Sequence, residues 1–191
     1  MKFKSFMICL IGLISSTSLF GQSGLQLYTG ISNAKSKDAL LTPEGKSHPG
    51  FHLGADARLN SGNMYFVVGG QYHVIEFLAV DDKNFFSIDQ KMQWLKLRVG
   101  LGYNIYNFNS RLAIRAKTLG SIDVISSHPG SIAMGPYEIF NSGTAGAVIG
   151  IGLDAYGFTF DIEYEKGFFN AVNMVKGTEF NFFTISIGVI F

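Results

Sequence analysis

Apolar and polar residues alternate one by one along most of the chain. In the segment Lys91–Asn104, one face carries Leu95, Leu97, Val99, Leu101 and Tyr103, and the other carries Trp94, Lys96, Arg98, Gly100 and Gly102. A period of two is typical of a β-strand with two different faces. The same period predicts eight strands, which are Leu25–Ser32, Gly50–Asn60, Asn63–Ile75, Lys91–Asn104, Arg111–Val124, Thr144–Ala155, Phe158–Glu165 and Glu179–Phe191.

The connections between these strands alternate between short and long. Residues 60–63, Asn104–Ser110 and Tyr156–Gly157 are short, and the first and last are rich in turn-forming residues. The long connections are Asn33–Pro49, Glu76–Gln90, Ile125–Gly143 and Gly167–Thr178. Membrane barrels have this arrangement, with short turns at one end and long loops at the other. The pattern therefore predicts an all-β fold, an eight-stranded antiparallel up-and-down barrel that spans a membrane.

The composition of the two faces separates a membrane barrel from a soluble one. Nearly every predicted strand has one face of bulky apolar residues, whereas the other face is rich in glycine and bears the charges. The interior of an eight-stranded barrel is only just wide enough for its side chains. The sparse polar face fits that interior, and the apolar face fits lipid. A soluble periplasmic barrel that binds an apolar ligand remains an alternative.

The two ends of the chain add to this prediction. Lys2 and Lys4 precede an apolar run from Phe6 to Ile14, which is typical of a secretory signal peptide. We expect residues 1–21 to be this signal, cleaved between positions 18 and 22, and residues 22–191 to form the barrel domain. The last strand alternates up to the aromatic Phe191. We therefore expect export to the outer membrane of a Gram-negative bacterium.

Composition excludes several classes of function. The only cysteine, Cys9, lies in the predicted signal, so thiol chemistry and disulfides are not expected in the barrel. Of the 15 Lys and Arg residues, 13 remain without Lys2 and Lys4, against 14 Asp and Glu residues, a net charge of −1. Nucleic-acid binding needs a basic face and is not expected. No stretch after the signal is long and apolar enough for a membrane helix.

Charged residues gather on the predicted inward face. The pattern has two interpretations: a selectivity filter in a small solute or ion channel, or a network of ion pairs that fills a narrow lumen. We favour the network, because an unpaired buried charge is costly. By parity, the inward set is Asp56, Arg58, Lys96, Arg98, Arg115, Lys117, Asp123, Asp154, Asp161, Glu163 and Glu165.

Candidate catalytic and metal-binding residues are few. His52 and His73 point inward on neighbouring strands, but their spacing matches no metal signature, and a hydrogen-bonded histidine is the simpler interpretation. His48 and His128 are expected in loops. Ser126, Ser127 and His128 have no third group placed by the sequence, so ordinary turn chemistry is favoured over a hydrolase. We predict no enzyme activity, no metal and no cofactor.

Three stretches resemble the outer-membrane β-barrel family common in Bacteroidetes and often called PorT-like. They are QWLKLRVGLGY at 93–103, GTAGAVIGIGL at 143–153 and FTFDIEYEKGFFN at 158–170. The resemblance implies an eight-stranded barrel in the outer membrane, with Phe191 as the signal that the barrel-insertion machinery reads. It implies a link to secretion through one founding member, and it carries over no functional residue.

The function predicted from these observations is that of a non-enzymatic outer-membrane barrel with a charge-plugged lumen. Any specific activity would lie in the loops, through a protein or lipid partner, with a role in secretion or envelope integrity. The loop 125–143 is almost uncharged, so it is either a contact surface or a plug that packs the mouth shut. The residues that would form this surface are Ile132, Met134, Tyr137, Ile139 and Phe140.

Overall fold

The computed structural model describes residues 24–38, 42, 47–76, 91–109, 112–127, 140–173 and 175–191. The predicted signal peptide, the contact residues Ile132–Ile139 and His128 lie outside these ranges. Within them, no helix is long and apolar enough to cross a membrane.

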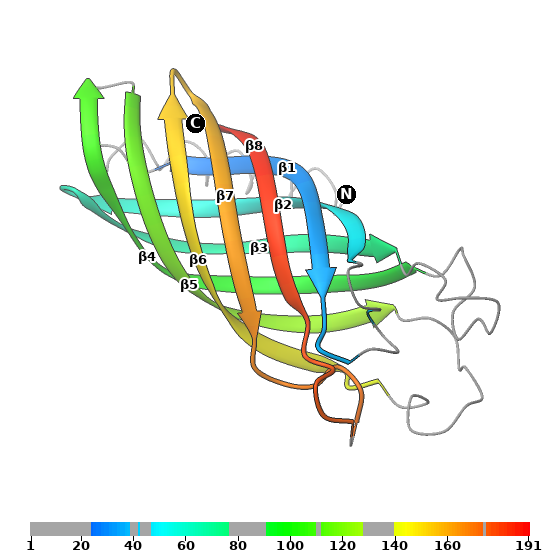
Figure 1. Ribbon diagram of the computed structural model, residues 1–191. Helices are drawn as coiled ribbons and strands as arrows, with labels where there is room; N and C mark the ends of the chain where they lie inside the picture. Colours follow the sequence, from blue (N-terminus) through cyan, green and yellow to red (C-terminus); the bar gives the residue numbers. More distant parts are fainter. Residues whose placement is uncertain are drawn as a thin grey trace, which may run out of the picture.

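The fold is a closed barrel in which eight antiparallel strands pair in chain order (Figure 1). β1 and β8 close the wall, and their register runs from Gln26 opposite Ile190 to Lys35 opposite Asn181. Closure removes the free sheet edge that would otherwise invite aggregation. The strands are β1 (Gly24–Lys35), β2 (His48–Ser61), β3 (Met64–Glu76), β4 (Lys91–Asn109), β5 (Leu112–Ser127), β6 (Gly143–Ala155), β7 (Phe158–Gly167) and β8 (Asn181–Ile190).

All eight predicted strands are present, and the all-β barrel prediction is confirmed. The prediction of a turn over Asn104–Ser110 was wrong, because β4 continues to Asn109. Its last residues pair with β5 across two register shifts, at Asn104/Tyr106 and Asn107/Asn109. An asparagine-rich segment is typical of turns, but here strand pairing prevails over composition. β1 also extends to Lys35, and β2 starts at His48, so the first long loop is shorter than predicted.

Tight turns join the strands at one end of the barrel, which we call the short-turn end. Gly62, in the turn between β2 and β3, has φ of 66°, and Gly157, between β6 and β7, has φ of 89°. These left-handed conformations favour glycine, and they allow a two-residue turn to match the twist of its strands. Tyr156 also has a positive φ, of 53°. The opposite end, where the longer connections lie, is called the long-loop end.

The inner and outer surfaces of the wall differ as the alternation predicts. Polar side chains fill most of the interior, beside a small buried apolar cluster of Tyr65, Val67, Leu119 and Val148. All the charged residues predicted for the inward face point inward, and apart from the half-buried Asp154 they are buried. Bulky apolar side chains, such as Leu97, Ile149 and Ile185, cover the outside and are 44–61% exposed. At the long-loop end the interior becomes apolar. The cluster there consists of Ala34, Ile75, Met92, Trp94, Ile125, Ala171, Val172, Phe180 and Phe182.

Candidate functional site

Arg98 lies at the middle of the interior and joins three parts of the wall. Its Nη2 donates to Asp56 Oδ2 on β2 at 2.7 Å, and its Nη1 donates to Glu163 Oε2 on β7 at 2.8 Å. Both carboxylates are buried, as is the guanidinium. Lys117 on β5 makes a second ion pair with Glu163. Two cations therefore share one carboxylate here, and the interior at this level is filled by paired charge.

A second group of ion pairs lies toward the short-turn end. Arg115 donates through Nε to Asp154 Oδ1 at 2.9 Å and through Nη2 to Asp161 Oδ2 at 2.7 Å. Asp154 also pairs with Arg58 at 2.8 Å, and Asp161 with Lys117 at 3.0 Å. Arg58, Arg115 and Lys117 thus bind two carboxylates from β6 and β7. The pairs connect directly to those of Arg98 through Lys117.

The third group lies beneath the apolar cluster at the long-loop end. Lys96 Nζ is 2.6 Å from Glu165 Oε2 and 3.8 Å from Asp123 Oδ2. The same Nζ lies 3.5 Å from the centre of the Phe182 ring, which favours a cation there. Phe182 in turn packs edge-on against Trp94, with ring centres 5.5 Å apart. Trp94 therefore belongs to the apolar cluster that closes the long-loop end.

The structure therefore brings together every residue of the predicted inward set. Each charged side chain of that set has an opposite charge within 4.0 Å. Such pairing offsets the cost of removing each charge from water, which is several kcal/mol per ion. Ion pairs occupy the barrel from the short-turn end to its middle, and the Lys96 group and the apolar cluster close the long-loop end. This arrangement can hold a rigid, closed interior.

Sequence reasoning missed several uncharged members of the network. Gln26 accepts from Arg58 Nε at 3.0 Å and donates to Asp161 Oδ2 at 3.0 Å, so it joins β1 to the network. Tyr28 donates to Asp56 Oδ1 at 3.2 Å, and Ser121 donates to Glu165 Oε1 at 3.0 Å. All three of these strand residues have the inward parity. The period of two was thus a sufficient signal, but only charged side chains were selected from it.

The inward histidines form a stack rather than a chelating pair. The rings of His52 and His73 lie 4.8 Å apart and nearly parallel, and His52 Nε2 is 2.8 Å from Ser186 Oγ. Two parallel rings do not direct their nitrogens at one ion, so the geometry is that of packed lumen side chains. The placement of His48 in a loop was wrong, because it begins β2 and points inward. There it is 3.0 Å from the Thr42 hydroxyl, which in turn contacts Ser36.

The loop residues that the structure describes are held to the barrel. Phe140 packs against the apolar cluster, and its backbone pairs with Val172. Of the predicted contact surface, this one described residue therefore lies where it helps to pack the mouth. An ion pair also joins two loops: Lys37, after β1, has its Nζ 3.2 Å from Oε1 of Glu179, before β8. Burial raises the pKa of the Glu179 carboxyl, but a backbone hydrogen bond and Lys37 lower it by more, so this pKa lies below its ordinary value.

Two further predictions concern single residues. Ser126, from the serine–histidine group, lies in β5 and not in the turn that the sequence favoured; it is exposed, and its hydroxyl donates to the Gln93 carbonyl on β4 at 3.3 Å. Phe191 is 71% exposed, and its backbone exchanges hydrogen bonds with Leu25 on β1. Its role as an insertion signal stays a prediction.

Comparisons with known proteins identify the fold. No family model and no curated protein sequence matches the chain. The structure resembles neisserial surface protein A (NspA), with a TM-score of 0.56, 16% identity, and coverage of 88% of this chain and 97% of that one. It also resembles the outer membrane enzyme PagL, with a TM-score of 0.53, 11% identity, and coverage of 87% and 98%. At these identities the likeness shows a shared barrel fold and nothing finer.

Proposed function

We propose that this protein is an integral outer-membrane barrel whose lumen is closed and whose activity lies in its long loops. The observation that carries the proposal is the inverted distribution of side chains. Buried ion pairs fill the inside, while exposed Leu, Ile, Val and Phe cover the outside of the strands. In water such an outer surface would drive aggregation, whereas lipid solvates it. The fold shared with NspA and PagL, the latter described as an outer-membrane protein, supports the same location.

The closed interior favours a scaffold over a channel. A conducting pore needs a water-filled path, and an eight-stranded barrel has little space beyond its own side chains. Here the ion pairs of Arg98, Arg115 and Lys96 occupy that space, and Trp94 and Phe182 lie above them. The pairing of these charges therefore supports a network that fills the lumen over a selectivity filter. A channel would give discrete conductance steps whose ion preference changes with Arg98→Glu.

The loops at the long-loop end remain the proposed location of any specific activity. The uncharged residues Ile132, Met134 and Tyr137 are proposed to contact a protein or lipid partner, with a role in secretion or envelope integrity. The absence of enzyme activity is also part of this proposal. PagL is described as an enzyme, but a shared fold carries no chemistry from one barrel to another.

The test of this proposal is the gel mobility of the protein extracted from the outer-membrane fraction, boiled and unboiled. A closed barrel stays folded in detergent until it is heated, so the unboiled protein is expected to run at a different position. Recovery from the soluble periplasm, with no mobility shift, would contradict the proposal and favour the ligand-binding alternative. Capture of a partner that is lost in Ile132→Ser/Tyr137→Ser, with the mobility shift unchanged, would locate the activity in the loop.

A further inference from the structure

The outer surface of the strands carries very few charges, and all of them lie at the long-loop end. Among the strand residues that the structure describes, the outward positions hold only Lys35, Glu76, Lys91 and Lys166 as charged side chains. Glu76 and Lys91 are directly opposite each other on β3 and β4, and their side chains pair at 3.1 Å. Lys35 and Lys166 have no such partner: within the described part of the chain, no carboxylate lies within ion-pair distance of either.

Strand register places these two lysines in one row. Lys35 on β1 is opposite Asn181 on β8. On the other side of β8, Glu165 is opposite Phe182, so the next residue, Lys166, adjoins Asn181. Neighbouring strands lie about 4.8 Å apart, which puts the two lysine Cα atoms about 10 Å from each other. The row therefore offers two ammonium groups with an amide between them.

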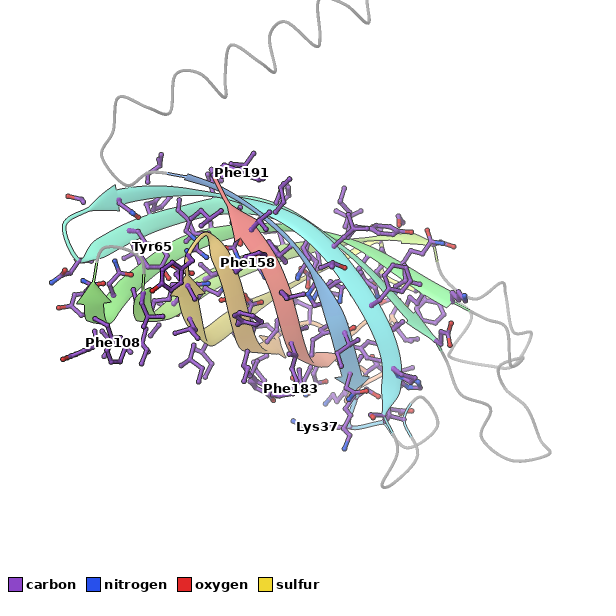
Figure 2. All side chains as sticks on the ribbon, turned by 90° about the horizontal axis from the view of Figure 1, so that it is seen from above. Lys37, Tyr65, Phe108, Phe158, Phe183 and Phe191 are labelled. Atoms are coloured by element: carbon purple, nitrogen blue, oxygen red, sulfur yellow. The ribbon has the colours of Figure 1, made fainter. Side chains whose placement is uncertain are left out.

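An apolar wall begins directly beneath this row. The next outward row consists of Tyr164, Phe183 and Asn33, and the one after it of Ile162, Ile185 and Ile31. Phe183 and Ile185 are each 44% exposed, and Ile31 is 65% exposed. Figure 2 shows Phe183 on the outside of the wall, on the same side of the barrel as Lys37. Cationic groups thus lie immediately above a surface suited to hydrocarbon chains.

Nearby charges leave the row basic. Glu179 interacts electrostatically with Lys166, and Lys37 pairs with the same carboxylate at 3.2 Å; Asp38 is the other described carboxylate on these loops. Lys176, which is exposed, adds a further cation on the loop between β7 and β8. A ligand that fits this surface needs anionic oxygen atoms at the level of the lysines and an apolar tail below them. A lipid with a phosphate headgroup has both.

We propose that the row Lys166–Asn181–Lys35 binds the phosphate headgroup of a membrane lipid whose acyl chains lie on Phe183 and Ile185. The proposal rests on the proposed function, because it requires the outer wall to lie in a bilayer. Lysines at a membrane surface each add about a fivefold preference for anionic lipid. The site would select, from the surrounding lipid, molecules with an accessible phosphate.

Native mass spectrometry of the purified barrel in detergent tests the site. The probe is an equimolar mixture of dioleoyl phosphatidic acid and dioleoyl phosphatidylcholine, which share their acyl chains and differ in net headgroup charge. Wild type is expected to retain phosphatidic acid preferentially. Lys35→Gln/Lys166→Gln is expected to lower that preference by up to about 25-fold, since each lysine contributes about fivefold. The control, Glu76→Gln/Lys91→Gln, removes an ion pair from the same rim without a change in net charge, and it should keep the preference.

Three results would overturn the proposal: equal retention of both lipids by wild type, an unchanged preference in Lys35→Gln/Lys166→Gln, or an equal loss in the control. Displacement of the lipid by millimolar inorganic phosphate would also overturn it, in favour of a site for free phosphate. Each protein is first checked for the mobility shift and for insertion into vesicles. If wild type fails to insert, the proposed function fails; if it inserts but shows no preference, only the lipid site fails.

Discussion

Arg98 is fully buried between Asp56 and Glu163, which belong to two other strands of the barrel. We expect Arg98→Met to lower the free energy of unfolding by about 3–5 kcal/mol, because it leaves Asp56 without its cation in a buried place. Urea unfolding of the protein folded in lipid vesicles measures this change. Lys91→Met is the control, since it breaks the exposed pair with Glu76 and should cost less than about 1 kcal/mol.

A second experiment on Arg98 tests why its replacement lowers the free energy of unfolding. In Asp56→Asn/Glu163→Gln, the Arg98→Met substitution no longer leaves a buried carboxylate without its cation. Its cost in that background should therefore be smaller than in wild type. An equal cost in both backgrounds would show that Arg98 acts through packing rather than charge.

Gly102 provides a prediction of a different kind, based on space. A Cβ at this position would lie 1.9 Å from Cζ of Tyr65, whose buried ring lies across the glycine. We expect Gly102→Ala to displace the ring and to destabilise the barrel by about 1–3 kcal/mol in the same urea assay. Gly120→Ala is the matched control, because a Cβ there would lie 3.9 Å from its nearest neighbour. If both substitutions cost the same, the ring is not held as described.

At the scale of the strand, the period of two predicted which side chains point inward but not which of them meet. Arg98 and Glu163 are 65 residues apart, and they meet because barrel closure brings β4 and β7 across one narrow lumen. That encounter depends on strand tilt and stagger, which a local pattern does not contain. The end of β4 was missed because the local pattern there is misleading. Its asparagines favour a turn, whereas pairing with β5 keeps the strand extended.

The outward face of a strand gives an element-scale prediction about its solvent. Ile185 lies near the middle of β8 and points out of the barrel. If lipid surrounds it, Ile185→Arg should cost about 2–4 kcal/mol of folding free energy in vesicles. Leu59→Arg, two residues from the turn after β2, should cost less than about 1 kcal/mol, because arginine there reaches the interface. Equal and small costs would argue against a membrane at the middle of the wall.

At the scale of the whole molecule, closure of the barrel and occupation of its lumen are separate features. Closure follows from the register of β1 with β8. Occupation depends on three successive groups of side chains. They are the ion pairs of Arg115, the ion pairs of Arg98, and Lys96 beneath the apolar cluster. Because the groups lie at different depths, the loss of one of them leaves the others across the lumen.

This layered arrangement predicts how the protein behaves in a planar lipid bilayer. Wild type is expected to give no discrete conductance steps. Trp94→Ala/Phe182→Ala removes two rings from the apolar cluster. This variant should also give no conductance steps, because the ion pairs of Arg98 and Arg115 remain below the cluster. Steps from wild type would contradict the closed lumen and favour a channel. Steps from the double variant alone would show that the apolar cluster is the barrier, and that water passes the ion pairs.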